Sequence, residues 1–456
     1  MNNPQPASPP ANDAFEAARR HFVDGISHFD AARDALAQTD FEASLALLPA
    51  RASTLGNLGA THIRLGRPEA ALPMLERALA LEPDDTEARS QHGLALAMLG
   101  DPLQALASFD EVLRLAPGHI PALHQRCLML SALQRHPDAL LAADHLLALD
   151  PQSEPAWWAR ADTLHRLDRH AEALAAYDQL LAINPLLHKA WSQRGGILKD
   201  LGRTEEATAA FRQALSLGAD PELTAYFLAA LPVADQGADS QQAPATAPRA
   251  YVEALFDDYA DQFDKHLVGQ LGYRAHRVLV EHLLALPGPK PHFASALDLG
   301  CGTGLCGPLV KSRTSRLEGV DLSALMLEKA RATGAYDHLA HADLSDHLTQ
   351  AALAGSRHDL VLSADVFIYV GALEAVFAGV HQAMAPGGIF CFSVESAADA
   401  VDYALTPGLR YAHSARYLRQ LAASTGFTEL AMLAHPIRHE QRRAIDGLFV
   451  YFLKPA

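Results

Sequence analysis

The chain has 456 residues, of which 49% are hydrophobic and 20% are charged, and its formal net charge is −16. This composition is typical of folded globular proteins, and the length predicts two or three domains. The negative charge disfavours nucleic acid and anionic membranes as partners, because phosphate groups attract basic surfaces. No run of eighteen uncharged apolar residues occurs, so the sequence predicts no membrane-spanning helix.

The N-terminus and the cysteines indicate the cellular compartment of the protein. Residues 1–17 begin with a Pro-, Ala- and Asn-rich stretch that has no basic flank and no apolar run, so a disordered tail is expected rather than a signal peptide. The cysteines are too few for a disulfide framework, and their spacing fits no zinc site. We therefore expect a cytoplasmic protein without a bound metal. These cysteines are Cys127, Cys301, Cys306 and Cys391.

Residues 18–231 repeat with a period of 34. Prolines recur at this interval after similar segments, and small residues and aromatic residues recur at fixed offsets before them. Five units agree in register over about 52–219, and a degenerate one precedes them. The pattern resembles the tetratricopeptide repeat, which implies two antiparallel helices per unit stacked into an all-α solenoid. The prolines are Pro83, Pro117, Pro151 and Pro185.

The resemblance to tetratricopeptide repeats implies a protein or peptide partner in the groove of the solenoid, but the sequence does not identify it. The groove-facing positions lack the Lys, Arg and Asn residues that would clamp a C-terminal carboxylate. A scaffold or self-association surface is the alternative. Trp157 is expected to pack between repeats, whereas Trp158 fits packing and ligand contact equally well. The groove positions are Gly56, Ser90, His124, Trp158 and Ser192.

Residues 232–248 separate this repeat region from a second domain at 249–456. The segment is rich in Ala, Pro, Gln and Asp and has no apolar periodicity, so we expect a linker that docks on neither side. The two halves are accordingly expected to fold as separable units.

Strands and helices alternate in the second domain, which predicts a parallel sheet with helices on both faces. Two helices, at 252–267 and 271–286, precede the alternation. The last two apolar segments, 429–436 and 447–454, are joined by a short polar stretch and are expected to pair as an antiparallel hairpin. The preceding strands are expected at 294–299, 316–321, 337–342, 358–364 and 388–395.

A glycine-rich motif, ALDLGCGTGL at 296–305, follows the first of these strands and opens a helix. Such a turn lets the backbone approach a ligand closely and offers it free N–H groups. Gly302, Gly304 and Gly307 also spell the dinucleotide fingerprint GxGxxG, which alone is a weak signal. Asp298 favours a ligand with an ammonium group over a pyrophosphate, and Asp321 ends the next strand where a ribose would lie.

With these motifs the second domain resembles class I S-adenosylmethionine-dependent methyltransferases, in particular predicted ones that carry N-terminal tetratricopeptide repeats. The segment FDDYADQF at 256–263 adds to the likeness. The resemblance implies a Rossmann-like sheet of seven strands with an antiparallel last strand.

It also implies roles for particular residues. Asp298 to Gly304 would cradle the methionine part of S-adenosylmethionine, Asp321 the ribose, and Asp343 the adenine amino group. Two alternatives stay open: Asp343 caps the helix that starts near Ser345, and Met326 is a core residue. The cofactor-binding set is Asp298, Gly300, Cys301, Gly302, Gly304, Asp321, Leu322, Met326, Asp343, Leu344 and Ala364.

Candidate catalytic residues follow the fourth strand and the fifth. Asp365 is expected to orient the substrate or accept a proton, with helix capping as the alternative, and Tyr369 lies four residues further on. His413 falls where related enzymes build substrate loops, with a surface histidine as the alternative. Tyr259 and Phe263 either close over the cofactor or pack in the core.

The segment SADVFIY at 363–369 lacks the Asn/Asp-Pro-Pro-Tyr motif, which disfavours the amino-group methylation that this motif supports. The sequence therefore predicts methyl transfer to an unidentified small-molecule or protein acceptor, with the repeats recruiting a partner or substrate. One alternative is an inactive methyltransferase fold that acts in binding or assembly. A weaker one is an NAD-dependent oxidoreductase.

Overall fold

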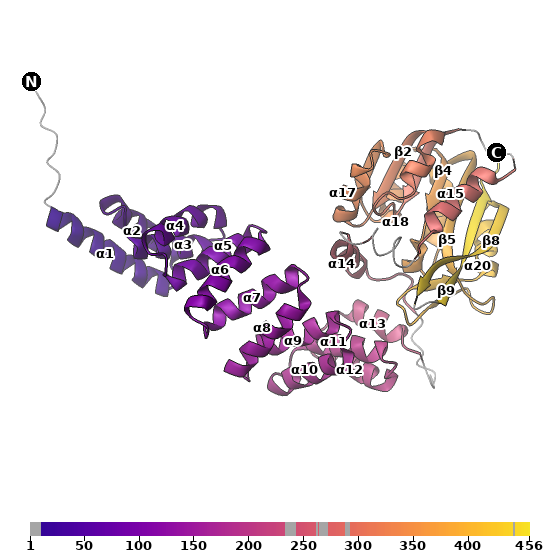
Figure 1. Cartoon of the computed structure of the whole chain (residues 1–456). Coiled ribbons are helices and arrows are strands. Elements are labelled where there is room, and N and C mark those ends of the chain that lie inside the picture. Colours follow the sequence, from indigo (N-terminus) through magenta and orange to yellow (C-terminus); the bar gives the residue numbers. More distant parts are fainter. Residues whose placement is uncertain (1–10, 233–242, 261–262, 264–271, 288–291, 441–442) are drawn as a thin grey trace, which may run out of the picture. The chain divides into compact units, whose positions relative to one another are not determined.

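A computed structural model describes residues 11–232, 243–260, 263, 272–287, 292–440 and 443–456 (Figure 1). The described chain divides into two compact units, Met1–Leu201 and Gly202–Ala456. No described helix is long and apolar enough to cross a membrane.

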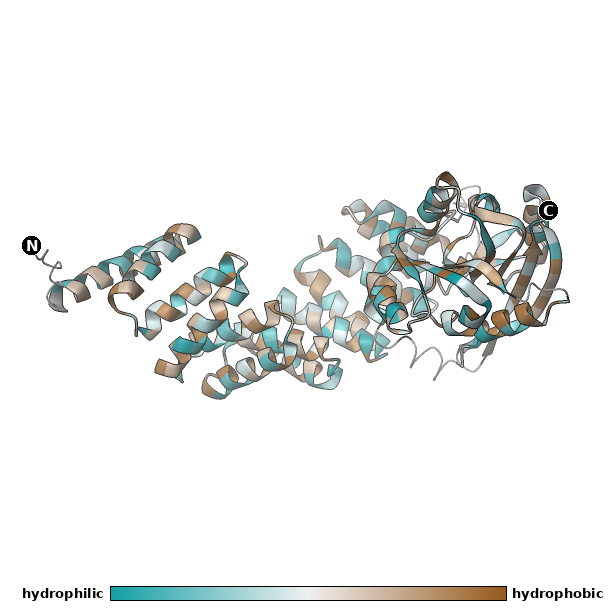
Figure 2. Ribbon diagram, turned by 90° about the horizontal axis from the view of Figure 1, so that it is seen from above, coloured by the Kyte–Doolittle hydropathy of each residue, from teal (hydrophilic) through white to brown (hydrophobic). Residues whose placement is uncertain are grey.

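The first unit consists of helices that pack as successive antiparallel pairs, which confirms the predicted helical repeats. Apolar and polar residues alternate along each helix, so that teal and brown segments follow one another in Figure 2. The helices are α1 (Ala11–Asp30), α2 (Asp34–Leu47), α3 (Ala52–Arg64), α4 (Pro68–Leu81), α5 (Thr86–Met98), α6 (Pro102–Leu115), α7 (Ile120–Ala132), α8 (His136–Leu149), α9 (Glu154–Arg166), α10 (His170–Ile183) and α11 (His188–Asp200).

Small residues at one repeat position allow the two helices of a pair to approach closely. A Cβ atom on Gly59 would lie 2.5 Å from Leu75, and one on Gly93 would lie 2.8 Å from Phe109. Real Cβ atoms do not come so near their neighbours, so only a glycine fits there without a shift of the facing side chain. The small residues that recur at this offset therefore mark a close approach of the two helices of a repeat.

Ion pairs with the same 34-residue period join neighbouring repeats. Arg126 lies 2.6 Å from Asp110, and the equivalent pairs, Arg160–Asp144 and Arg194–Asp178, are 2.7 Å and 2.8 Å long. Each pair connects the second helix of one repeat to the first helix of the next. The pairs are partly exposed, so each contributes less than about 1 kcal/mol.

The adjacent tryptophans of α9 have partners within the solenoid. The indole N–H of Trp157 donates to the carbonyl oxygen of Pro151 at 2.9 Å, in the turn between α8 and α9. Trp158 packs edge-on against Tyr177, with ring centroids 6.0 Å apart. Trp158 therefore packs within the solenoid, whereas the hydrogen bond of half-buried Trp157 is local to the turn before α9.

The second unit begins with α12 (Thr204–Ser216) and α13 (Pro221–Ala229) and continues into an α/β domain. Its sheet runs in the order β3-β2-β1-β4-β5, all parallel, and β9 pairs antiparallel with β5 and with β8. The strands are β1 (Phe293–Leu299), β2 (Thr314–Asp321), β3 (His338–His341), β4 (His358–Ser363), β5 (Met384–Ser396), β6 (Tyr403–Leu405), β7 (Tyr411–His413), β8 (Thr428–Glu440) and β9 (Arg443–Leu453).

The antiparallel last strand is confirmed, but the sheet has nine described strands rather than seven. The additional pair is the short antiparallel hairpin of β6 and β7, which joins the end of β5 where Glu395 pairs with Ala412. Each of its strands has three residues, too few to show an alternating pattern in the sequence. The terminal hairpin also extends further than expected, because β8 and β9 continue into the polar stretch between the two apolar segments.

Alternating side chains of the strands enter two hydrophobic cores, one on each face of the sheet. In β5, Ile389 and Cys391 pack beneath α15 (Ala275–Ala285) and α16 (Gly307–Val310), whereas Phe390 and Phe392 pack beneath α18 (Leu344–Leu353), α19 (Glu374–Ala383) and α20 (Ala415–Thr425). The expected helices at 252–267 and 271–286 are found as α14 and α15, and most of the residues between these two lie outside the described residues. The helices and helical turns are α14 (Arg249–Tyr259), α15 (Ala275–Ala285), α16 (Gly307–Val310), η2 (Lys311–Arg313), α17 (Ala324–Ala332), α18 (Leu344–Leu353), η3 (Phe367–Tyr369), α19 (Glu374–Ala383) and α20 (Ala415–Thr425).

The end of the expected linker is docked on the α/β domain. The carbonyl oxygen of Ala245 accepts hydrogen bonds from the backbone N–H groups of Gly371 and Ala372, at 2.8 Å and 2.9 Å. The backbone N–H of Ala247 donates to the carbonyl oxygen of Tyr369 at 2.9 Å. Backbone groups make these bonds, which a search for apolar periodicity does not detect, so the expectation of an undocked segment is corrected for 243–248. Residues 233–242 lie outside the described residues.

Candidate active site

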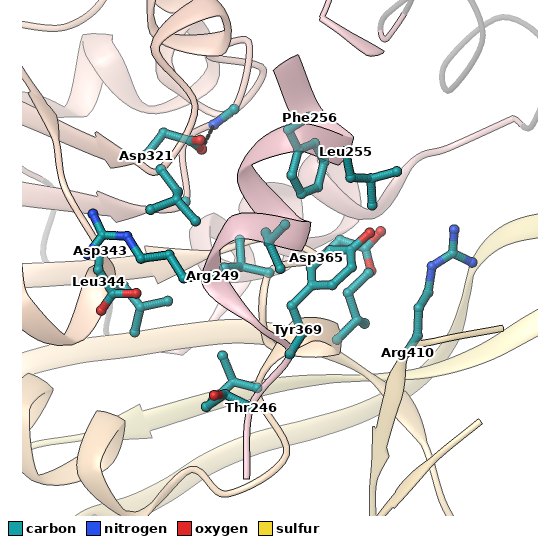
Figure 3. Close-up of a pocket in the computed structure, with 18 of the residues that line it drawn as sticks. Thr246, Arg249, Leu255, Phe256, Asp321, Asp343, Leu344, Asp365, Tyr369 and Arg410 are labelled. Carbon is teal, nitrogen blue, oxygen red and sulfur yellow. Dashed lines mark hydrogen bonds between the residues drawn. The ribbon is translucent and has the colours of Figure 1, made fainter. Parts of the chain in front are cut away.

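A cavity of about 580 Å³ opens at the carboxyl ends of β1, β2 and β4, between them and α14 (Figure 3). Parallel sheets place their ligand sites at this edge, because the loops that leave the strands diverge there. The lining combines the glycine turn, strand-terminal carboxylates, aromatic rings and arginines. It includes Glu222, Thr246, Ala247, Arg249, Phe256, Tyr259, Phe263, Tyr273, Gly300, Gly302, Asp321, Leu322, Asp343, Leu344, Ala364, Asp365, Tyr369, Arg410 and Arg438.

The glycine turn brings its backbone to the cavity in a left-handed conformation. Gly300 and Gly302 have φ angles of 68° and 54° and line the cavity. A Cβ atom on Gly300 would lie 2.4 Å from Val366, whereas one on Gly302 would meet no atom within 4 Å. Gly302 therefore leaves open space at the turn, and a ligand in this space can approach the main chain closely.

Asp321, the last residue of β2, places its carboxylate beside this turn. It accepts hydrogen bonds from the backbone N–H groups of Gly302 at 2.8 Å, drawn dashed in Figure 3, and of Ser323 at 2.9 Å. Burial raises the pKa of Asp321, and these N–H groups oppose that rise. The carboxylate lines the cavity and keeps further lone pairs for the hydroxyl groups of a ligand.

Asp298 lies beneath the turn rather than in the cavity lining. It is 1% exposed, and its carboxylate accepts a hydrogen bond of 2.7 Å from the hydroxyl of Tyr336. Burial raises the pKa of Asp298 to about 7. Its position supports the turn from below, and Tyr336, which the sequence did not single out, holds it there.

The remaining residues of the expected cofactor set divide between cavity and core. Leu322, Leu344 and Ala364 line the cavity. Met326 is 1% exposed in the core, and Cys301 is buried against α17, so the alternative of a core residue holds for Met326. Gly304, expected to cradle the methionine part, lies outside the cavity lining and faces Ala330 and Tyr336 instead.

Asp343 lies in the cavity lining and also caps a helix. Its carboxylate accepts a hydrogen bond from the backbone N–H of Ser345 at 2.8 Å, at the start of α18. The two expectations for this residue are therefore compatible, since a carboxylate has room for more than one donor.

Asp365 occupies the middle of the cavity in a strained conformation. Its φ of 62° is left-handed, which costs a non-glycine residue roughly 1 kcal/mol, although Asp tolerates it better than most. Its carboxylate lies 3.3 Å from the guanidinium of Arg438, which also contacts Glu395 in a short hydrogen bond. Arg438 is 2% exposed, so one buried cation holds two carboxylates.

Tyr369 and Arg410 form the end of the cavity that lies away from Asp343, as Figure 3 shows. Burial raises the pKa of Tyr369, and the positive charge of Arg410 opposes that rise. Phe256 packs edge-on against the Tyr369 ring, at 5.4 Å between centroids. Aromatic walls of this kind exclude water from the space between the two ends.

Tyr259 and Phe263 both line the cavity, which favours contact with a ligand over a role in the core. Their rings pack edge-on, with centroids 5.4 Å apart.

His413 lies outside the cavity lining and is fully buried. Its Nε2 lies 2.9 Å from the carbonyl oxygen of Val370 and 3.0 Å from that of Gly371, to which it donates. Burial lowers the pKa of His413 to about 4, so the ring is neutral near pH 7. Its position favours support of the wall after η3 over a direct part in catalysis, and it is not the surface histidine of the alternative expectation.

Several lining residues gave no usable signal in the sequence. Arg410 and Arg438 lie in segments without a motif, and Thr246 lies in the expected linker. No group of three or more His, Cys, Asp or Glu side chains that could hold a metal ion occurs among the described residues.

Comparison with protein-family models agrees with both halves of this architecture. A model described as "Methyltransferase domain" matches residues 296–388, which extend from β1 into the beginning of β5. Two described as "Tetratricopeptide repeat" match residues 57–120 and 188–220, and one described as "Bacterial transcriptional activator domain" matches residues 110–184.

The curated relatives of this chain are named as methyltransferases or methyltransferase-like proteins. Human methyltransferase-like protein 27 is 45% identical over 87 residues, which are 19% of this chain and 35% of the relative. A malonyl-(acyl-carrier protein) O-methyltransferase of Enterobacter lignolyticus is 29% identical over 187 residues, 39% of this chain and 68% of the relative. A trans-aconitate 2-methyltransferase of Paracidovorax citrulli is 28% identical over 153 residues, 33% and 53% of the two chains.

Among solved structures, a tetratricopeptide repeat protein from Parabacteroides merdae is similar at 20% identity and a TM-score of 0.41, over 47% of this chain and 84% of that chain. The chain spans about a third of the length of the human relative, 68% of the Enterobacter relative and 53% of the Paracidovorax relative. The family models and the sheet order agree, and this chain carries a class I methyltransferase domain preceded by tetratricopeptide repeats.

Proposed function

We propose that this protein is an S-adenosylmethionine-dependent methyltransferase that acts on a small-molecule or protein acceptor. The observation that carries the proposal is the open space at Gly302, next to the Asp321 carboxylate and within one cavity that also contains Asp343. A backbone cradle flanked by carboxylates fits a ligand with an adenosine and an amino-acid part.

The residues of this end of the cavity would hold the cofactor. The turn at Gly300 and Gly302 would take the methionine part, Asp321 the ribose hydroxyls, and Asp343 the adenine amino group. When bound, S-adenosylmethionine supplies an electrophilic methyl group, so the protein needs chiefly to orient the acceptor and exclude water.

The other end of the cavity would receive the acceptor. Tyr369 lines this end and Asp365 lies between the two ends, where the aromatic rings of Phe256 and Tyr259 would limit the access of water. The buried pair with Arg438 fixes the Asp365 carboxylate, which suits a residue that orients an acceptor or takes its proton.

Both kinds of acceptor occur in the names of the relatives, since one acts on a protein-bound malonyl group and another on trans-aconitate. We propose that the repeat region recruits a protein or peptide partner, or the acceptor itself. Tetratricopeptide repeats present an extended surface suited to that task.

Calorimetric titration of the full chain with S-adenosylhomocysteine and, separately, with NADH tests the cofactor. We expect binding of the first and none of the second. Tight NADH binding without any response to S-adenosylhomocysteine would assign the glycine turn to an oxidoreductase instead.

Transfer of tritiated methyl groups to fractionated cell lysate then tests activity and sorts the acceptor into protein or small-molecule pools. A chain that binds the cofactor and labels neither pool would support the alternative of an inactive fold with a binding role.

A further inference from the structure

Helix α14 carries an apolar stripe that faces the cavity. Its members recur at intervals of three and four residues, the spacing of one helical face, and all of them line the cavity. The two hydrophobic cores of the sheet are built from other described residues. Figure 3 shows Phe256 of this helix beside the Tyr369 ring. An apolar stripe usually packs on a core, so α14 is placed to cover a ligand instead. The stripe consists of Val252, Leu255, Phe256 and Tyr259.

The start of α14 is fixed to the α/β domain. Tyr251 packs against Tyr226 of α13, with ring centroids 5.6 Å apart. Tyr226 is 0% exposed, and its hydroxyl donates a hydrogen bond of 2.6 Å to the carbonyl oxygen of Leu409. The segment just before the helix is held by the main-chain hydrogen bonds of Ala245. The first turn of α14 therefore has a rigid base.

A side-chain hydrogen bond holds the later part of α14. The hydroxyl of Ser323 donates to the carboxylate of Asp257 at 2.5 Å, and Ser323 is 0% exposed. The same hydroxyl oxygen caps α17 by accepting the backbone N–H of Met326 at 3.1 Å. A hydroxyl that donates to a carboxylate makes a short, strong bond. About 12 Å of helix separate Asp257 from the first turn, so loss of this bond would let α14 swing about its base.

Ser323 also connects α14 to the cofactor end of the cavity. Its backbone N–H donates to the carboxylate of Asp321 at 2.9 Å, beside the glycine turn. The ion pair between Arg249 and Asp346, 3.4 Å long, is a second link of α14 to the domain. Its side chains are 55% and 65% exposed, so it contributes little. The bond from buried Ser323 is the stronger of the two links.

We propose that α14 is a lid over the cofactor end of the cavity, and that the hydrogen bond from Ser323 to Asp257 latches it shut. Asp257 lies outside the cavity lining and is a positioning residue, since it holds the aromatic side chains of α14 over the ligand. The latch sets the rates at which S-adenosylmethionine enters and S-adenosylhomocysteine leaves, which ties each turnover to the opening of α14. This inference rests on the proposed methyltransferase function.

The test measures association and dissociation rate constants of S-adenosylhomocysteine on the immobilised full-length protein by surface plasmon resonance. The variants are Asp257→Ala, Asp257→Asn, Ser323→Ala and the double variant of Asp257→Ala with Ser323→Ala. The control is Glu253→Ala, which also removes a carboxylate from α14 and also lies outside the cavity lining.

We expect Asp257→Ala to raise the dissociation rate roughly tenfold, the lower range for the loss of a hydrogen bond to a charged group. The association rate should rise as well, because the lid has to open before the ligand enters. Asp257→Asn keeps an acceptor oxygen without the charge, so its rates should lie between those of the wild type and Asp257→Ala. Glu253→Ala should stay within about twofold of the wild type.

The double variant tests the pair itself. In the Ser323→Ala background, Asp257→Ala should change neither rate, because the bond is already lost. The missing cap of α17 is common to both proteins of this comparison and cancels.

The lid and the proposed function fail in different ways. A wild type that does not bind S-adenosylhomocysteine overturns the proposed function. Normal binding with unchanged rates in Asp257→Ala, an equal effect of Glu253→Ala, or an effect that persists without the Ser323 hydroxyl overturns the latch and leaves the function intact. Faster dissociation with unchanged association overturns the lid and makes α14 a fixed wall.

Discussion

The two ends of the cavity are built in different ways. The cofactor end comes from a short stretch of chain, where a strand, a glycine turn and the next strand-terminal carboxylate meet through backbone geometry. The acceptor end is assembled from segments far apart in the sequence, including Thr246, Tyr369, Arg410 and Arg438. One end therefore depends on local conformation and the other on tertiary packing, and substitutions should separate the two.

The largest effect is expected at the buried ion cluster of the acceptor end. Arg438→Ala leaves the carboxylates of Asp365 and Glu395 without their buried counter-charge, which should lower the free energy of unfolding by about 3–5 kcal/mol. Urea denaturation measures this. The control is Arg419→Ala, whose pair with Glu429 has side chains 55% and 34% exposed and should contribute less than about 1 kcal/mol. Equal losses in the two variants would show that the cluster is not held as a buried unit.

The cofactor end should respond through binding. Asp321→Ala removes charge-assisted hydrogen bonds, so we expect S-adenosylhomocysteine affinity to fall by about 2–4 kcal/mol in calorimetric titration. Glu328→Ala, at an exposed position of the neighbouring α17, is the control and should not change the affinity. An Asp321→Ala affinity within twofold of the wild type would mean that the ribose is held elsewhere.

The buried His413 should make the free energy of unfolding depend on pH. The pKa of His413 is lowered to about 4 by burial, whereas an unfolded chain takes up this proton near pH 6.5. Between these values the unfolded state holds more protons, so stability falls as the pH falls from about 6.5 to 4, by about 3 kcal/mol in total.

His413→Gln can still donate to the carbonyl oxygens of Val370 and Gly371 but does not titrate. Urea denaturation at about pH 7 and about pH 4.5 should therefore show a smaller loss for this variant than for the wild type. The same acid sensitivity in both proteins would assign it to other groups.

The smallest effect separates the two roles of Asp343. Ser is as good a helix N-cap as Asp, so Asp343→Ser should keep the free energy of unfolding within about 0.5 kcal/mol while cofactor affinity falls by about 1 kcal/mol. Asp343→Ala should lose about 1 kcal/mol of stability as well. An unchanged cofactor affinity in Asp343→Ser would mean that Asp343 only caps α18 and does not bind the cofactor.

Periodic and local features were predictable from the sequence. A 34-residue period forces the same helix pair to recur, and its close contacts, such as Gly93 against Phe109, follow from the need to share one core. The turn at Gly300 and Gly302 was predictable because its left-handed φ angles require glycine. The antiparallel terminal hairpin followed from the shortness of its connection.

The acceptor end was not predictable, because a single arginine on a polar strand looks like a surface residue until the fold buries it. Arg438 is such a case, and Tyr226 is another, since its partner Leu409 lies 183 residues away. The docking of residues 243–248 could not be predicted for a different reason. Main-chain groups make these hydrogen bonds, and they do so whatever the residue type.

The anchoring of Tyr226 and of the Ala245 segment has a consequence for exchanging modules between proteins. A chimera that grafts a new recognition array onto this catalytic domain should retain α13, because a junction at 249 would remove this helix, whose Glu222 lines the cavity. Helix α13 should therefore be treated as part of the catalytic domain, and the junction of a chimera has to lie before it.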